Sequence, residues 1–374
     1  MKILHIPNYY YPHIGGIEQT AHDIVNSLRD SNEQKVICFN SGKKTGTDEV
    51  DGIEVIRCGC LIKVSSQALS LSYNKLLKKQ FKNFEPEMVI FHFPNPFVAH
   101  FLLKRIKKHP NCKLIVWWHL DITRQKILGK LFKGQTKKLL NRADKIIATS
   151  PNYIQGSRFL KEFEQKCTVI PSCINENRLC ITESTLRMAE EVRAKNKDKI
   201  ICFAVGRHVE YKGYEYLIEA SKNLDDNFKI FIGGTGKLTE KLKTLATSDK
   251  KIEFLGKLTD GEVKAYMYAC DIYCFPSITK NEAFGLALAE AMFFGKPAVT
   301  FTIDGSGVNF VNLDKITGIE VENRNSDKYS EALKLLAENK DVRAKYGQAG
   351  YERVSELFTL AKFKENIIKL MADL

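Results

Sequence analysis

Two carboxylates that could accept hydrogen bonds from a ligand, Glu282 and Glu290, stand eight positions apart in the stretch NEAFGLALAEAMFFGKPAVTF, residues 281–301. Between them lies an apolar run of mostly small residues, with Gly285 near its start. The sequence Gly-Lys-Pro at 295–297 is typical of a helix end, and the β-branched run after it predicts a strand. The stretch therefore predicts a loop that carries Glu282, followed by a helix, a turn and a strand.

The start of this predicted helix could bind an anion. The amides of Phe284, Gly285 and Leu286 have no partner inside the helix, and the positive end of the helix dipole lies behind them. Phosphate is a common ligand of such a site. Glu290 lies about two turns further along, where its carboxylate could reach a neutral diol but not the same phosphate. The alternative is purely structural: Glu282 caps a buried helix, and Glu290 lies on its surface.

Two cations follow another predicted strand, residues 200–205. Arg207 and Lys212 flank a turn that leads into a helix. Two cations in a loop after a strand suit a pyrophosphate group. Ion pairs with Glu210 and Glu215 are the structural alternative.

Further candidates lie after predicted strands, where open α/β sheets bind their ligands. The pair Gly15 and Gly16 precedes a helix and lets the backbone approach a ligand closely. His119 follows the strand predicted at 113–118, although a lone histidine is more often structural than catalytic. Gly234 belongs to the run GGTGK, which has neither the Walker spacing nor the Rossmann glycine pattern.

These motifs resemble those of retaining glycosyltransferases of family 4, which have the two-Rossmann (GT-B) architecture. The E-x7-E segment from Glu282 to Glu290 carries the resemblance, which covers most of the chain and is strongest over residues 204–301. It is weaker over residues 3–18 and 117–171. The resemblance implies an α/β fold with two Rossmann-like domains that face each other across a cleft. It also implies a C-terminal helix that crosses back to the first domain.

The resemblance assigns a role to each candidate residue. Glu282 would contact the donor sugar, and Glu290 would contact the ribose of the nucleotide. Arg207 and Lys212 would hold the diphosphate and stabilise the leaving group, while His119 would support the sugar from the first domain. The other implied donor-binding positions are Gly15, Gly16 and Gly234, the phosphate-facing amides of Phe284, Gly285 and Leu286, and Lys257 and Leu258, whose backbone would pair with the base.

The chain departs from the family pattern in one loop. After residue 301 the family usually has two glycines and then a Glu, whereas here the run is IDGSGVN and Asn309 stands where the Glu is expected. Donor or acceptor preference near this loop is therefore open. No D-x-D tripeptide occurs in the chain, which argues against a metal clamp on the diphosphate. We expect no metal and no cofactor, because the nucleotide-sugar is itself a substrate.

The net charge of +13 is concentrated in one segment. Residues 75–145 contain 17 Lys and Arg against four Asp and Glu, a net charge of +13 for the segment. Such a patch usually binds nucleic acid or an anionic membrane surface. No RNA- or DNA-binding motif accompanies it, so we expect no nucleic acid. A solvated basic face without a partner is the alternative.

Targeting signals and cysteines indicate the compartment. No apolar run approaches the ~20 residues of a spanning helix, and the N-terminus lacks a signal-peptide pattern. The ten cysteines are scattered without a CxxC pair, which indicates reduced thiols. We expect a cytoplasmic protein that could attach peripherally to the inner face of the cell membrane.

Strands alternate with helices along the chain, which predicts parallel sheets covered on both faces. The first domain, which the resemblance implies is the acceptor side, is expected at 1–175, together with the C-terminal helix at 358–374. A polar segment, 176–198, is expected to be the linker, and the donor domain is expected at 199–357. The predicted strands are residues 2–6, 35–40, 53–57, 88–93, 113–118, 145–150, 168–171, 200–205, 228–233, 252–256, 271–276 and 299–301, and the predicted first-domain helices are 17–28, 68–81, 97–107 and 128–143. The core is expected to end near residues 318–321.

The expected activity is retaining transfer of a hexose-type sugar from a nucleotide-sugar to a hydroxyl of a saccharide acceptor. A UDP-sugar is favoured as donor, and GDP-mannose is the alternative. The acceptor is expected to be lipid-linked, in surface polysaccharide or glycolipid biosynthesis. The rival hypotheses are another GT-B enzyme, such as a sugar-nucleotide epimerase or a phosphorylase, and a non-enzymatic protein that binds anionic lipid or nucleic acid.

Overall fold

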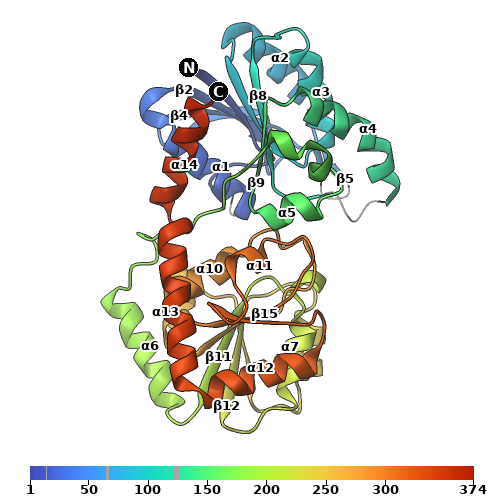
Figure 1. Ribbon diagram of the computed structural model, residues 1–374. Coiled ribbons are helices and arrows are strands. Elements are labelled where there is room, and N and C mark those ends of the chain that lie inside the picture. Colours follow the sequence, from blue (N-terminus) through green and yellow to red (C-terminus); the bar gives the residue numbers. More distant parts are fainter. Residues whose placement is uncertain (14, 65–66, 122–125) are drawn as a thin grey trace. The chain divides into compact units, whose positions relative to one another are not determined.

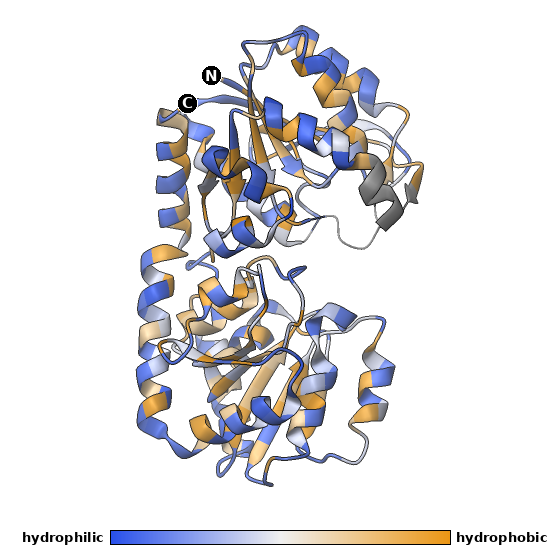
Figure 2. Ribbon diagram, turned by 45° about the vertical axis from the view of Figure 1, so that its right-hand side comes forward, coloured by the Kyte–Doolittle hydropathy of each residue, from blue (hydrophilic) through white to orange (hydrophobic). Residues whose placement is uncertain are grey.

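The computed structural model describes residues 1–13, 15–64, 67–121 and 126–374. These residues form two compact units (Figure 1), of which the first is Met1–Pro171 with Phe363–Leu374 and the second is Ser172–Lys362. Within each unit the strands are mainly hydrophobic, whereas the helices carry hydrophilic residues along much of their length (Figure 2). Ile14 of the predicted glycine loop and residues 122–125 of the basic segment lie outside the described residues.

An eight-stranded sheet forms the centre of the first unit, in the order β10-β9-β8-β7-β1-β2-β4-β3. Its pairs are parallel except for β3, which runs antiparallel to β4 at one edge. All six residues of β7 are buried, as expected for a parallel sheet covered on both faces. The strands are β1 (Lys2–Ile6), β2 (Glu33–Phe39), β3 (Gly46–Val50), β4 (Ile53–Cys58), β7 (Met88–Phe93), β8 (Lys113–Trp118), β9 (Lys145–Ala148) and β10 (Cys167–Val169), and a separate hairpin contains β5 (Ile62–Val64) and β6 (Gln67–Leu69).

Helices pack against this sheet, and the C-terminal helix is one of them. The ring of Phe363 lies 6.0 Å from that of Trp117 on β8, which confirms the predicted return of the chain end to the first unit. The helices are α1 (Gly16–Ser27), α2 (Tyr73–Asn83), α3 (Pro96–Ile106), α4 (Lys126–Arg142), α5 (Pro151–Gly156) and α14 (Leu360–Ala372), with 3-10 turns at Arg29–Ser31 and Leu160–Lys166.

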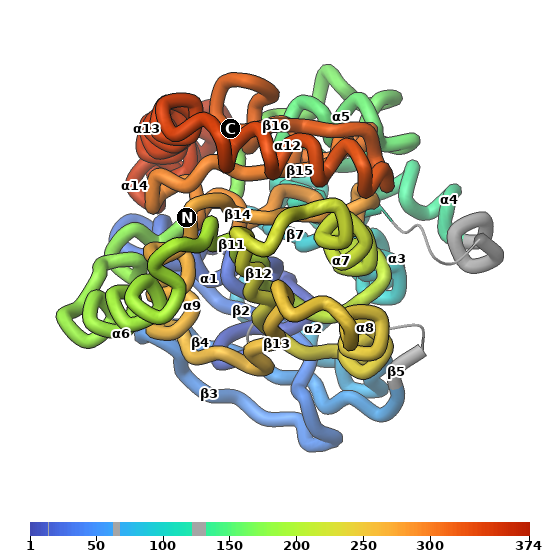
Figure 3. Tube along the Cα trace, turned by 90° about the horizontal axis from the view of Figure 1, so that it is seen from below, coloured from blue at the N-terminus to red at the C-terminus, as the bar shows by residue number. Residues whose placement is uncertain are grey.

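The second unit has a six-stranded parallel sheet in the order β13-β12-β11-β14-β15-β16 (Figure 3). Numbered from its first strand, this order is 3-2-1-4-5-6, which is the doubly wound Rossmann topology. The prediction of two Rossmann-like α/β domains is therefore confirmed. The strands are β11 (Ile200–Val205), β12 (Phe228–Gly233), β13 (Ile252–Gly256), β14 (Ile272–Phe275), β15 (Ala298–Phe301) and β16 (Gly318–Val321).

Helices lie on both sides of this row of strands, with α7 and α8 on one side and α6 and α9 on the other (Figure 3). The helices of the second unit are α6 (Glu183–Lys195), α7 (Tyr214–Ser221), α8 (Thr239–Leu245), α9 (Asp260–Ala269), α10 (Leu286–Phe293), α11 (Val308–Val311), α12 (Ser326–Glu338) and α13 (Lys340–Leu357), with a 3-10 turn at Glu210–Lys212.

The expected linker, residues 176–198, is not an irregular connection. Most of it is helix α6, and the whole segment belongs to the second unit. The hydroxyl of Thr182 caps the helix by accepting from the amide of Thr185. Thr185, Ala189 and Val192 are buried at helical spacing, and α6 packs against α9. A weak apolar stripe is therefore enough to hold a helix in place where a neighbouring helix covers the stripe.

Two other expectations near residue 60 needed correction. The helix predicted at 68–81 begins only at Tyr73, because residues Gln67–Leu69 pair as strand β6. Strand β3 was not predicted, since its residues are mostly polar and exposed. Asp51 and Gly52 both have positive φ in the turn between β3 and β4. The dipeptide Asp-Gly is a strong hairpin signal and could have revealed this strand.

The described residues contain no helix with both the length and the apolar character needed to cross a bilayer. All ten cysteines lie in the described part of the chain, and each is free.

Candidate functional site

The central strands of the second unit, β11 and β14, lie side by side, and the chain leaves their carboxyl ends toward opposite edges of the sheet. In doubly wound sheets this switch point opens the crevice that binds the ligand. Arg207 and Lys212 follow β11, and Glu282 follows β14. The topology therefore brings the two predicted cations and the first predicted carboxylate to the same switch point.

Backbone contacts hold the loop of Lys212 against the loop that follows β14. Gly213 has a φ of +62°, and a side-chain carbon at this position would lie 2.2 Å from the carbonyl oxygen of Pro276. Only glycine fits such an approach. The amide of Ile278 donates to the carbonyl of Tyr211 at 2.9 Å. These contacts fix Lys212 beside the segment that contains Glu282.

Lys212 and Glu282 form an ion pair, in which Nζ lies 2.5 Å from Oε2. Only 13% of the Lys212 side chain and 14% of the Glu282 side chain are exposed. The Lys212 ammonium also lies 4.9 Å from the centre of the Phe275 ring. Glu210, an alternative partner that the sequence left open, pairs instead with Lys237 at 2.5 Å. The structure thus places a cation and a carboxylate next to each other.

Two serines that the sequence analysis did not identify support Glu282. Ser277 Oγ donates to Oε2 of Glu282 at 3.2 Å, and Ser306 Oγ donates to its backbone carbonyl at 2.5 Å. The amide of Gly307 donates to the carbonyl of Ala283 at 3.1 Å. The loops after β14 and β15 therefore hold the Glu282 segment together, and no sequence motif distinguishes these serines.

Arg207 is the more accessible of the two cations. Its side chain is exposed, and one terminal nitrogen donates to the hydroxyl of Tyr211 at 3.3 Å. A side-chain carbon on the neighbouring Gly206 would lie 3.7 Å from the ammonium of Lys212. Arg207 and Lys212 therefore emerge from one compact loop, where both can contact a single anionic group.

Helix α10 begins at Leu286 with Gly285 as its N-cap, in the left-handed region at a φ of +96°. Because Gly285 has no side chain that could cap the helix, the first amides of α10 are available to an anion. The amide of Leu288 is already bonded to the carbonyl of Gly285 at 3.0 Å. Phe284 is buried, and its ring packs edge-on against Phe358 at 5.2 Å. Only the backbone of Phe284 can therefore take part in binding.

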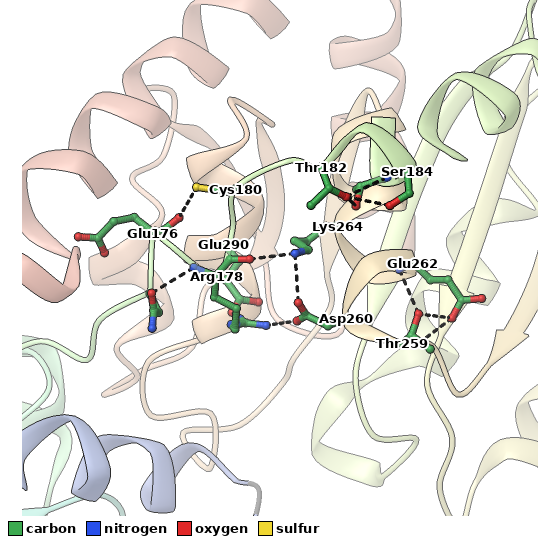
Figure 4. A network of polar contacts seen from close by, with 12 residues as sticks. Glu176, Arg178, Cys180, Thr182, Ser184, Thr259, Asp260, Glu262, Lys264 and Glu290 are labelled. Atoms are coloured by element: carbon green, nitrogen blue, oxygen red, sulfur yellow. Dashed lines mark hydrogen bonds and ion pairs between the residues drawn. The ribbon is translucent and has the colours of Figure 1, made fainter. Parts of the chain in front are cut away.

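Glu290 lies on α10 in a polar network that the sequence did not reveal (Figure 4). Its Oε1 accepts from Arg178, whose other terminal nitrogen contacts Asp260. Lys264 donates to the backbone carbonyl of Arg178 at 2.9 Å and lies 3.2 Å from the Asp260 carboxylate. Burial raises the pKa of the Glu290 carboxyl, and the charge of Arg178 opposes that rise. Glu290 is therefore not the isolated surface carboxylate of the structural alternative.

The loops after β11 and β12 approach each other through glycine. Gly234 has a φ of +103°, and a side-chain carbon there would lie 2.0 Å from the carbonyl oxygen of Gly206. In the next loop, after β13, Lys257 is exposed and Leu258 is half-buried. The Leu258 side chain fills the space beside Gly233. The predicted base-contacting positions thus continue the row of loops at the carboxyl edge of the sheet.

In the first unit, His119 follows the carboxyl end of β8, and its amide donates to the carbonyl of Phe93 on β7 at 3.2 Å. Burial lowers the pKa of His119 to about 3, so the imidazole is neutral at physiological pH. Gly15 is the N-cap of α1, which begins at Gly16 and has no side-chain cap. These three positions lie at the same edge of the first sheet, beyond β1 and β8.

Two family patterns together match most of the chain. Residues 188–353 match the family described as Glycosyl transferases group 1, and residues 14–178 match Glycosyltransferase Family 4. The chain belongs to the glycosyltransferases of the family 4 type. The class of enzyme predicted from the sequence is therefore confirmed.

Full-length relatives and solved structures agree with this classification. The O-antigen chain mannosyltransferase C of Escherichia coli is 29% identical over 378 residues, which cover 100% of this chain and 99% of the relative. The D-rhamnosyltransferase WbpZ of Pseudomonas aeruginosa is 29% identical over 96% of this chain and 92% of the relative. The crystal structure of Anabaena Alr3699/HepE in complex with UDP has a TM-score of 0.78 at 18% identity and covers 100% of both chains.

The position at which this glycosyltransferase departs from the family pattern has a structural role. Asn309 Oδ1 accepts from the amide of Ile303 at 2.7 Å, and its Nδ2 donates to the carbonyl of Phe301 at 3.2 Å. The amide of Asn309 thus bonds to the last residue of β15 and to the loop that follows it. Asn309 stabilises the loop that also contains Ser306, the residue that donates to the carbonyl of Glu282.

Proposed function

We propose that this glycosyltransferase moves a hexose-type sugar from a nucleotide-sugar to a hydroxyl of a saccharide acceptor, with retention of anomeric configuration. The Lys212–Glu282 ion pair carries the proposal, because it places a cation and a carboxylate together at the switch point of the second unit. A diphosphate requires the cation, and the hydroxyls of the attached sugar are suitable partners for the carboxylate.

Each charged residue has a role in this reaction. Arg207 and Lys212 bind the diphosphate and stabilise the charge that develops on the leaving phosphate oxygen. The acceptor hydroxyl attacks on the face from which the nucleoside diphosphate departs. The C1–O bond to the phosphate breaks as the new C1–O bond forms, and the departing phosphate oxygen takes the hydroxyl proton. Glu282 orients the sugar hydroxyls, and Glu290 accepts hydrogen bonds from the ribose.

The mechanism does not require a metal ion. Lys212 is largely buried, so its charge acts in surroundings of low dielectric constant and is more effective than a solvated lysine. The first amides of α10 add the positive end of a helix dipole. Together with Arg207, these groups can replace the metal that other glycosyltransferases hold with a D-x-D tripeptide, which this chain lacks.

The donor sugar is mannose or a close relative in our proposal. Two full-length relatives carry the names mannosyltransferase and D-rhamnosyltransferase, which favours GDP-mannose, the alternative of the sequence analysis, over the UDP-sugar expected first. A UDP-sugar is the second candidate, because a structural neighbour was solved with UDP. The name of the first relative refers to an O-antigen chain, which supports a saccharide acceptor in surface polysaccharide biosynthesis.

A lipid-linked acceptor would bring the first unit to a membrane surface from the cytoplasmic side. Helices α2 and α3 pack beside each other, whereas Leu77, Phe81 and Leu102 on these helices are buried in the unit's core. Attachment through these two helices would therefore depend on charge rather than on the insertion of these apolar side chains. The exposed lysines of this surface are Lys75, Lys78, Lys79, Lys82, Lys104, Lys107 and Lys108.

A donor screen tests the proposal. GDP-mannose, UDP-glucose, UDP-galactose and dTDP-sugars are each incubated with the enzyme, and release of the nucleoside diphosphate and the thermal shift are measured. We expect GDP-mannose to give the largest signals in both measurements. Turnover of a UDP-sugar alone would support the second candidate, and interconversion of sugar-nucleotides without hydrolysis or transfer would show an epimerase.

A further inference from the structure

The family resemblance assigns one histidine of the first unit, His119, to the donor sugar, and two more histidines lie beneath it on neighbouring strands. His5 is on β1 and His92 is on β7, and both are completely buried. His92 pairs in register with Trp117 on β8, so His119, two residues further along, lies on the same face of the sheet. His92 is therefore the inner neighbour of the histidine that the family resemblance assigns to the donor sugar.

A hydrogen bond joins the two side chains. Nδ1 of His92 lies 2.9 Å from Nε2 of His119. The ring centres are 5.2 Å apart, and the ring planes differ by 12°. With these values the two nitrogens face each other, and the rings lie almost in one plane. Only one of the two nitrogens can carry the proton, because burial lowers both pKa values and keeps both rings neutral.

The surroundings of His92 indicate which nitrogen donates. Its Nε2 is enclosed and has no hydrogen-bond partner among the described residues. A proton on Nε2 would leave a buried N–H without an acceptor, which is rarer in proteins than a buried acceptor without a donor. The proton of His92 therefore belongs on Nδ1, where Nε2 of His119 accepts it. His119, being neutral, must then carry its own proton on Nδ1.

We propose that His92 is a positioning residue that donates from Nδ1 to Nε2 of His119 and thereby makes His119 present an N–H at Nδ1. This inference rests on the proposed function only for the role of His119 toward a sugar. Among the residues that the structure describes, Nδ1 of His119 has no hydrogen-bond partner. Unlike Nε2 of His92, it is not fully enclosed by the protein. His119 would thus offer the sugar a hydrogen-bond donor, and a hydroxyl oxygen would accept.

Nitrogen NMR on protein labelled with ¹⁵N-histidine tests the tautomer without any substrate. Two-bond correlations between ring nitrogens and ring protons distinguish Nδ1–H from Nε2–H rings, and the His119→Asn spectrum identifies the His119 signals. We expect the Nδ1–H form for His119. His5 is an internal reference with the opposite tautomer, because its Nε2 contacts Oε1 of Gln34 at 2.8 Å while the Gln34 amide donates to Val25. An Nε2–H form for His119 would overturn the proposal.

Variants of His92 test the positioning role. In His92→Asn the side-chain amide lies near the former Nδ1 and can donate, whereas in His92→Gln it lies near the former Nε2. We expect His92→Asn to keep the His119 signature and most of the donor hydrolysis. His92→Gln should lose the signature and lower donor hydrolysis about 10-fold to 100-fold, by analogy with the loss of the outer partner of a metal-ligating histidine.

The two measurements separate the possible failures. If His92→Gln lowers turnover while the His119 tautomer is unchanged, His92 is structural and the positioning role is refuted. If no donor is turned over by the wild-type enzyme, the proposed function fails, but the NMR spectrum still decides the tautomer. If His92→Asn behaves like His92→Gln in both measurements, donation from the Nδ1 position is not what His119 requires.

Discussion

Arg178 and Glu290 lie 112 positions apart in the chain and form an ion pair within the second unit (Figure 4). Arg178 belongs to the segment that enters the unit, and Glu290 belongs to the helix that follows the proposed sugar-contacting loop. The ion pair leaves Oε2 of Glu290 free of Arg178. The same carboxylate can therefore be held by Arg178 through one oxygen and contact a ribose through the other.

This ion pair predicts a pH dependence of nucleotide binding. Burial raises the pKa of Glu290 and Arg178 opposes the rise, so Arg178→Ala should raise that pKa further. A protonated Glu290 accepts fewer hydrogen bonds from a ribose. Binding of GDP or UDP should therefore weaken as pH falls, and the midpoint should lie at higher pH in Arg178→Ala than in the wild type. Calorimetry over a pH series measures both midpoints.

Arg187→Ala is the matched control, because Arg187 is an exposed arginine of the same unit that pairs only with its helix neighbour Glu183. Its midpoint should equal that of the wild type. An unchanged or lower midpoint in Arg178→Ala would show that Arg178 does not control the ionisation of Glu290.

The phosphate-binding role predicts large losses of turnover. Lys212→Ala or Arg207→Ala should cost about 2–4 kcal/mol of transition-state stabilisation, the range for one preorganised electrostatic donor. The measurement is kcat/KM for donor hydrolysis. Lys237→Ala removes an exposed lysine that pairs with Glu210 beside the same loop and should have little effect. A loss of turnover supports the assignment only if thermal unfolding shows that the variant is folded, whereas near wild-type turnover in Lys212→Ala would refute the diphosphate assignment.

The two carboxylates should respond differently to truncation. Glu290→Ala should weaken binding of the nucleoside diphosphate alone, because a ribose contact does not depend on the sugar. In the proposal, Glu282 contacts the sugar but no other part of the donor, and its protein partner Lys212 keeps its charge in Glu282→Ala. Glu282→Ala should therefore leave that affinity nearly unchanged and lower turnover. Calorimetry with GDP and UDP, together with donor hydrolysis, checks both expectations. The reverse pattern would exchange the two roles.

Metal removal should leave the reaction intact. The positive groups at the switch point, Arg207, Lys212 and the start of α10, are all supplied by the protein. Activity should therefore survive an excess of EDTA. The assay compares initial rates with EDTA, with added magnesium and with added manganese. Loss of activity with EDTA that manganese restores would mean that a metal binds the diphosphate.

The basic surface of the first unit predicts attachment to anionic membranes. The protein should co-sediment with vesicles that contain anionic lipid at low salt and dissociate at high salt, because exposed charges are screened within ~8 Å at physiological ionic strength. Each lysine near the surface contributes ~1 kcal/mol. Changing Lys78, Lys79, Lys107 and Lys108 to Glu should abolish vesicle binding and leave donor hydrolysis unchanged.

The matched control for this experiment reverses four exposed lysines of the second unit, Lys241, Lys250, Lys340 and Lys345. The control has the same net charge as the test variant, so equal losses would mean that only total charge matters. If the wild-type protein does not co-sediment at low salt, the basic surface is a solvated face, and a soluble acceptor is favoured.

The sequence predicted the central strands with their bounds, including Met88–Phe93, Lys113–Trp118 and Ile200–Val205. Strands that are buried on both faces need continuous apolar runs, and the polar residues at the ends of those runs mark where the strands stop. Strands at the edge of a sheet do not need a continuous apolar run, so the mostly exposed β3 was not predicted. Helix α6 was not predicted for a related reason. Its apolar stripe is narrow, and such a stripe indicates a helix only when the helix that covers it is known.

The positions of the candidate site residues along the chain also follow from the amino-acid sequence. Loops after parallel strands gather at one edge of a sheet, so the strand pattern is enough to assign Lys212 and Glu282 to one site. The partners of these residues depend on the fold, because hydrogen bonds and ion pairs require distances between elements that the chain order does not specify. Lys212 with Glu282, Arg178 with Glu290 and His92 with His119 are all contacts between different elements. The residue types permitted many pairings, and packing selected these.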